Sequence, residues 1–148
     1  MTESFAQKML VTASALVIGF GTLIALAAHP ATDGVIVFFA DLLFWPLDGL
    51  QNADKPELRL ISGISGGVMI GWGVVLLGLS TKGMAQAPEL SLTLMERAII
   101  VWFVVDSVAS WIAGAPLNII GNLIFLVLFL WPIHVLRRGQ TTATSTAA

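Results

Sequence analysis

Three shortages narrow what this chain can do. The sequence has no cysteine, which excludes disulfide exchange, haem attachment through thiols and iron–sulfur clusters. Charged residues make up 11% of the chain, whereas a soluble domain averages about 25%. The two histidines, His29 and His134, belong to different segments, so the sequence predicts no metal-ligand cluster. We also expect no cofactor.

The apolar content fixes the broad class. Hydrophobic residues account for 57% of the 148 residues, and the mean hydropathy is +0.91. So little charge could not cover the surface of a soluble fold, and we therefore expect an integral membrane protein with the lipid bilayer as its partner. A net charge of −2 without a dense basic run argues against nucleic acid.

One stretch organises the rest of the chain. From Ala98 to Pro132 the only ionisable side chain is Asp106. A single helix of this length would measure roughly 50 Å, whereas the hydrocarbon core of a bilayer is about 30 Å thick. The run must fold back, and the residues 114–116 (Gly-Ala-Pro) are the one place where turn chemistry allows it. The stretch therefore predicts a helical hairpin inside the membrane.

Four apolar stretches are predicted to cross the membrane as an all-α, antiparallel four-helix bundle formed by residues 1–138. They cover residues 9–28, 58–80, 92–113 and 117–136. Residues 34–46 are also apolar but too short to span, which predicts a short interfacial or re-entrant helix on the outer side. An apolar loop that covers the end of the bundle is the alternative reading.

The remaining segments are predicted as connections and ends. Residues 81–90 read as a loop, and residues 139–148 are small and polar, which is typical of a disordered tail. A second interpretation of the first crossing stays open. Lys8, the apolar run after it and the tripeptide at 25–27 (Ala-Leu-Ala) also fit a cleavable signal peptide.

The seven Lys and Arg residues are divided unevenly between the two sides. Lys8, Lys82, Arg97, Arg137 and Arg138 lie on one side, and Lys55 and Arg59 lie on the other. Basic residues concentrate in cytoplasmic loops. The count therefore predicts that the two termini and the 81–90 loop are cytoplasmic. In general character the chain resembles small inner-membrane proteins of bacteria, which implies the inner (plasma) membrane.

The second crossing is rich in glycine. Gly63, Gly67 and Gly71 are spaced four apart and share one face of the predicted helix. In lipid, such faces serve close helix packing. The expected role is a packing seam within the chain, and contact with a second copy or with a partner in a larger membrane complex is the alternative.

Polar side chains are predicted to form one layer in the outer leaflet. Counting helix turns from the outer ends places Thr22, Ser65, Asp106 and Asn122 at similar depths. Asn118 shares a helix face with Asn122, and Ser110 shares one with Asp106. Arg59 is the cation nearest to this layer, and its side chain is long enough to reach inward or to extend to the headgroups.

Asp106 is the sharpest candidate for a binding site. A carboxyl group in lipid is costly and marks a functional candidate by default. Three roles are open for Asp106. It could form a structural hydrogen bond to Asn122 or a serine, it could bind a proton or a ligand, or it could contact a partner protein.

No catalytic pattern appears, because the chain lacks a Ser/His/Asp set at matching depth and a phosphate-binding glycine loop. The sequence therefore predicts a non-enzymatic structural, assembly or accessory subunit. The alternative is a small carrier with Asp106 as its protonatable centre.

Overall fold

The computed structural model describes residues 2–146 and confirms the expected class, because these residues form helices and no β-strand. The elements in chain order are α1 (Glu3–Leu26), α2 (Gly34–Leu43), α3 (Pro56–Gly78), the π-helical turn η1 (Leu79–Gly83), α4 (Met84–Gln86), α5 (Pro88–Ile112) and α6 (Leu117–Thr146).

The helices begin where local chemistry favours it. The Thr2 hydroxyl accepts a hydrogen bond from the Phe5 amide at 3.4 Å at the start of α1. Pro56 and Pro88 open α3 and α5, where a missing amide hydrogen costs nothing because the first turn has no intrahelical acceptor for it.

Three segments are long and apolar enough to cross a membrane: α1, the continuous helical stretch Pro56–Gln86, and Leu117–Gly139 of α6. These segments indicate a membrane protein. α5 has 25 residues, but every stretch of crossing length within it includes at least three ionisable residues from the set Glu89, Glu96, Arg97 and Asp106. The fourth crossing therefore stays a prediction.

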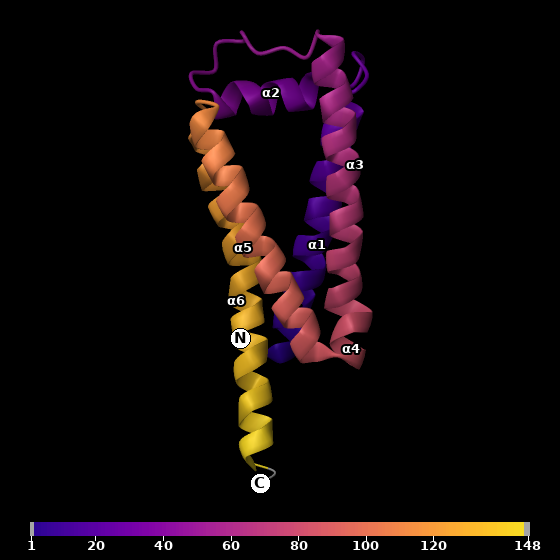
Figure 1. The fold of residues 1–148 in the computed structure, drawn as a ribbon, viewed down its shortest axis with the longest axis vertical. Helices are drawn as coiled ribbons and strands as arrows, with labels where there is room; N and C mark the ends of the chain where they lie inside the picture. The colour runs from indigo at the N-terminus through magenta and orange to yellow at the C-terminus, as the bar shows by residue number, and fades with distance from the viewer. Residues whose placement is uncertain (1, 147–148) are drawn as a thin grey trace.

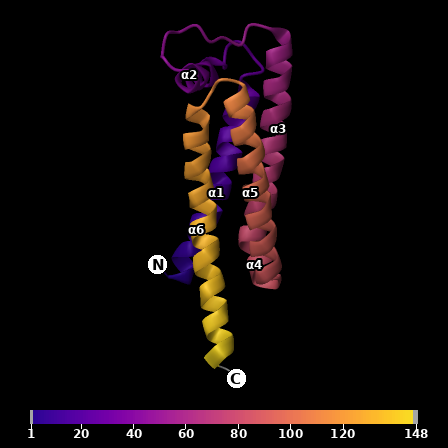
Figure 2. The same cartoon turned by 60° about the vertical axis from the view of Figure 1, so that its left-hand side comes forward.

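The long helices form two antiparallel pairs, α1 with α3 and α5 with α6 (Figure 1). The pairs converge at the end where both chain termini lie, and they diverge toward the end that α2 crosses. We call these the terminal end and the α2 end. The turned view in Figure 2 keeps α2 across the same end and shows α6 extending past the other helices. Contact between α1 and α6 joins the two pairs.

The apolar core explains why the pairs meet at the terminal end. Its buried members come from early and middle turns of α1 and α5 and from later turns of α3 and α6: Ala6, Leu10, Ala13, Val17, Leu76, Leu92, Met95, Ile99, Phe129, Ile133 and Leu136. Three aromatic rings close the core toward the α2 end. The centroid of the Trp102 ring lies 5.8 Å from that of Trp72 and 6.3 Å from that of Phe125.

The α1–α3 pair is held by direct backbone contact at glycines. A Cβ atom at Gly66 would lie 2.3 Å from the amide nitrogen of Ala25 and 2.6 Å from the carbonyl oxygen of Gly21. A Cβ at Gly73 would lie 3.0 Å from the amide nitrogen of Ile18. Such distances leave no room for any side chain, so glycine is what allows the two helices to touch.

This seam does not use the glycine face that the spacing singled out. A Cβ at Gly63 would make an ordinary contact, 3.5 Å from the Cβ of Ala28, whereas Gly67 and Gly71 have nothing within 4 Å. Adjacent residues of a helix point about 100° apart, so Gly66 and Gly67 belong to different faces. The role of Gly67 and Gly71 toward a second copy or a partner stays a prediction.

The turn between α5 and α6 is confirmed at the predicted place. Gly114 has a φ of +79°, a conformation that favours glycine. The Ala115 amide donates to the Ser110 carbonyl at 2.9 Å, and the Gly114 amide donates to the Trp111 carbonyl at 3.2 Å. These two bonds form a Schellman motif, which satisfies the last carbonyls of α5 before Pro116 directs the chain back.

The helix predicted over residues 34–46 forms as α2, Gly34–Leu43, and lies across the ends of the long helices (Figure 1). Phe39 packs its ring edge-on against Phe20 of α1, with centroids 5.7 Å apart. The buried Asp41 carboxylate accepts the Gly49 amide at 3.1 and 3.2 Å, which fixes the chain that leads on to α3. Its placement as an interfacial rather than re-entrant helix stays a prediction.

Two predicted irregular segments are helical instead. The prediction of a loop at 81–90 is wrong, because η1 and α4 continue α3 to Gln86 and only Ala87 separates them from α5. Gly83 there allows close approach, since a Cβ would lie 2.5 Å from the Ser91 hydroxyl. In place of the tail predicted at 139–148, α6 runs through Thr146 because helix propagation costs less than nucleation. Residues 147–148 lie outside the described part.

The seam predicts opposite effects for two adjacent substitutions. Gly66→Ala should lower the free energy of unfolding by about 1–3 kcal/mol, because the added methyl group meets backbone atoms of α1. Gly67→Ala should leave it unchanged or raise it by up to about 1 kcal/mol, because alanine favours the helix and meets nothing. Thermal unfolding in detergent, followed by circular dichroism, compares them; equal melting temperatures would contradict the seam.

Candidate functional site

The faces of α5 and α6 that turn toward each other change character along their length. Residues spaced three or four apart form one stripe on each helix. The stripe on α5 consists of Leu92, Met95, Ile99, Trp102, Asp106 and Ser110, and the stripe on α6 consists of Asn118, Asn122, Phe125, Phe129, Pro132 and Leu136. Both stripes are apolar at the terminal end and polar toward the α2 end, where the two helix pairs diverge (Figure 1).

The polar ends of these stripes bond to each other. The Asn118 amide nitrogen donates to the Asp106 carboxylate oxygen Oδ2 at 3.2 Å and to the Ser110 hydroxyl at 2.8 Å. The Ser110 hydroxyl in turn donates to the Asp106 carbonyl at 2.7 Å. Ser110 also supplies the carbonyl that closes the turn after α5, so the same residue links the hairpin turn to the polar group.

A separate hydrogen bond joins α5 to α6 one turn nearer to the aromatic rings. The Asn122 side chain is 4% exposed and donates to the Ser107 hydroxyl at 3.4 Å. Sequence reasoning missed Ser107, although its position three residues before Ser110 places the two serines on neighbouring parts of one face. We call Asp106, Ser107, Ser110, Asn118 and Asn122 the Asp106 cluster.

The structure therefore brings together four of the six candidate site residues, Asp106, Ser110, Asn118 and Asn122, but not Ser65 or Arg59. Ser65 is exposed on α3 and lies outside the cluster. Arg59 does not reach Asp106. Its Nε donates to the Ala53 carbonyl at 2.9 Å, and its guanidinium lies 3.8 Å from the Asp54 carboxylate. Equal depth did not imply contact, because α3 and α5 belong to different helix pairs.

The charge of Asp106 has no counterion within the described chain. Among residues 2–139, Asn118 is the one side chain that donates to its carboxylate, and the second carboxylate oxygen, Oδ1, has no donor. Asp106 is half-buried. A carboxylate in this position leaves hydrogen-bonding capacity for a group from elsewhere.

A further polar group that sequence reasoning missed joins α5 to α6 at the terminal end. Arg137 donates to the Glu96 carboxylate at 2.5 Å and to the Thr93 hydroxyl at 3.0 Å, and its Nε lies 3.6 Å from the Glu89 carboxylate. The sequence spacing could have predicted this group, because residues 89, 93 and 96 share one face of α5. This group explains how a predicted crossing tolerates Glu96, which is paired inside the hairpin.

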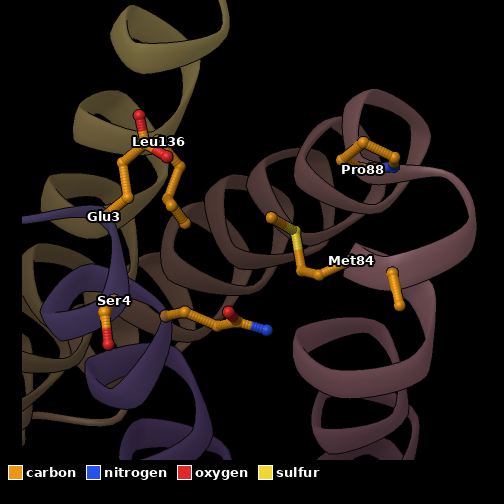
Figure 3. A pocket seen from close by; sticks show the side chains of 7 residues that line it. Glu3, Ser4, Met84, Pro88 and Leu136 are labelled. Carbon is orange, nitrogen blue, oxygen red and sulfur yellow. The ribbon is translucent and has the colours of Figure 1, made fainter.

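A hollow with a volume of about 460 Å³ also lies at the terminal end (Figure 3). The residues that line it come from α1, α4, α5 and α6: Glu3, Ser4, Gln7, Met84, Ala85, Pro88 and Leu136. A smaller hollow of about 270 Å³ lies at the α2 end, between the end of α2 and the turn after α5. Neither is lined by a member of the Asp106 cluster. Among residues 2–146, no group of three His, Cys, Asp or Glu side chains is placed to hold a metal.

Comparison with known proteins adds no assignment, because no protein-family model, curated protein or solved structure matches this chain.

The two hydrogen bonds of Asn118 should matter to the hairpin. Asn118→Ala removes both donors that link α6 to Asp106 and Ser110, and we expect the free energy of unfolding to fall by about 1 kcal/mol. Thr22→Ala is the matched control, because the Thr22 hydroxyl bonds only to Ile18 of its own helix. Unfolding in mixed micelles with increasing SDS measures both; equal losses would contradict a linking role for Asn118.

Proposed function

We propose that this chain is a small structural, assembly or accessory subunit of the inner (plasma) membrane, without catalytic activity, that packs against another membrane protein or a second copy of itself. One observation carries the proposal: α3 has a second glycine face that its own fold does not use. A Cβ at Gly67, Gly71 or Gly78 would have nothing within 4 Å.

Open glycines in the middle of a crossing need an explanation. Glycine destabilises a helix interior by about 0.5–1 kcal/mol relative to alanine. At Gly66 and Gly73 the gain is contact with α1, but the fold of this chain gives no such gain at Gly67 and Gly71. A partner helix that packs closely on this face would supply it, since small residues let backbones approach in lipid.

The proposal includes four crossings with both termini in the cytoplasm. α5 is as long as its neighbours and runs antiparallel to α6, and Glu96 and Asp106 both have partners in that hairpin. Both termini lie at one end of the bundle (Figure 1), as an even number of crossings requires. The basic residues near the terminal end favour the cytoplasm for it, which leaves α2 as an interfacial helix on the outer side.

A second candidate function is a small carrier with Asp106 as its protonatable centre. The observation that favours it is the half-buried carboxylate with a single donor. We place it second because the hollows of about 460 and 270 Å³ lie at the ends of the bundle and neither is lined by Asp106, whereas a solute site is usually a pocket lined by the groups that bind the solute.

Purification in mild detergent tests the proposal. The wild-type chain should elute as a complex, either with a second copy or with another membrane protein that mass spectrometry identifies. Gly67→Leu and Gly71→Leu should each reduce the bound partner by about tenfold or more, because the leucine side chain holds the helices apart.

Gly19→Leu on α1 is the matched control, because Gly19 also has nothing within 4 Å and lies on a different helix. This variant should keep the partner. A wild-type chain that elutes alone, or a complex that survives both α3 substitutions, would contradict the proposal.

A further inference from the structure

We propose that the Asp106 cluster docks a transmembrane helix of the partner protein through one Lys or Arg side chain at matching depth. The inference rests on the proposed function, because it needs a membrane-embedded partner, but it concerns α5 rather than the open glycine face of α3.

The cluster has a surplus of acceptors that receive no hydrogen bond. The amide group of Asn118 is committed to Asp106 and Ser110, and the Ser110 hydroxyl is committed to the Asp106 carbonyl. Asn122 donates to Ser107. This leaves Asp106 Oδ1 and the side-chain carbonyl oxygens of Asn118 and Asn122 without a donor from residues 2–139. Acceptors at membrane depth gain from an incoming donor, because lipid offers none.

A cation fits this surplus better than a neutral donor. The cluster contains one carboxylate, and the basic side chains that could have neutralised it are engaged elsewhere. Arg59 pairs with Asp54 beyond the start of α3, and Arg137 pairs with Glu96 at the terminal end. One positive charge would balance the single negative charge of the cluster, and ionisable groups within membranes commonly pair in this way.

The surroundings of Asp106 favour a cation that a helix carries over a dissolved one. No member of the cluster lines either of the two hollows described above, and Asp106 itself is half-buried rather than enclosed. On the side of Asp106 away from Ser107 and Ser110, helical spacing places Val105, Ala109 and Ile112 in one stripe. All three are exposed. A partner helix along this stripe would meet an apolar surface with one small residue beside a carboxylate.

The experiment reconstitutes the full-length protein in phosphatidylcholine vesicles with a synthetic leucine–alanine transmembrane peptide. The peptide carries one Lys in the outer-leaflet half, and control peptides carry Leu or Glu there. Energy transfer between dyes on protein and peptide reports association. The Lys peptide should associate about tenfold more tightly than the Leu peptide, and the Glu peptide should not exceed the Leu peptide.

Variants assign the preference to the carboxylate. Asp106→Asn should abolish it, Asp106→Glu should retain it, and the loop control Asp33→Asn should leave it unchanged. Circular dichroism and monodisperse elution show that each variant is folded. Equal association of the Lys and Leu peptides, or a Lys preference that survives Asp106→Asn, would overturn the inference.

Two further outcomes separate the inference from its alternatives. Carbodiimide labelling of Asp106 that Na⁺ or K⁺ blocks, together with no Lys preference, would assign the cluster to a small cation and overturn the inference. If Gly67→Leu dissociates the complex but the Lys preference is missing, the docking role of Asp106 fails and the accessory function stands. If the preference is present but Gly67→Leu keeps the partner, the proposed glycine interface fails alone.

Discussion

Backbone contact between α1 and α3 is the interaction on which the rest of the structure depends. A side chain at Gly66 would reach within 2.3 Å of the backbone of α1, so this position admits glycine alone. In lipid, apolar burial contributes little between helices, and such contact supplies van der Waals attraction where larger residues would hold the helices apart. The α1–α3 pair is therefore the closely packed unit of the fold, and the α5–α6 hairpin packs against it through contacts between α6 and α1.

The hairpin is joined to this unit at one end. Leu10 of α1, Leu76 of α3, Met95 of α5 and Phe129 of α6 meet in the core at the terminal end. Toward the α2 end the stripe on α5 changes from Ile99 and Trp102 to Asp106, and the polar residues there bond within the hairpin. This division leaves two features unused by the chain itself, the open glycines of α3 and the unpaired charge of Asp106. Both proposals follow from these features.

Much of the architecture could be predicted from the sequence because single residues dictate it. A charge-poor run longer than a bilayer is thick, with glycine and proline at 114–116, permits one hairpin. The same spacing logic identified Asp106, Ser110, Asn118 and Asn122, since all four lie close to one turn. The predicted loop at 81–90 failed because Gly83 serves close approach to Ser91 rather than chain reversal.

The remaining contacts required knowledge of which helices are neighbours. Counting turns gave Ser65 and Asp106 similar depth, but depth says nothing about the face of a helix or the identity of its partner. For the same reason, the sequence could not show that Gly66 rather than Gly67 contacts α1, or that Arg137 pairs with Glu96. Each depends on rotation of one helix about its axis relative to another, which no single segment encodes.

Disulfide cross-linking beside the Gly66 contact tests the packing of α1 against α3 most directly, and because the chain has no natural cysteine, only the introduced pair can form a disulfide within it. A Cβ at Gly63 would lie 3.5 Å from the Cβ of Ala28, which is within the range for a disulfide. The double variant Ala28→Cys/Gly63→Cys should therefore form an intramolecular bond on mild oxidation in membranes, whereas Ala28→Cys/Gly67→Cys should not. Equal cross-linking of both pairs, or of the second pair alone, would contradict the account.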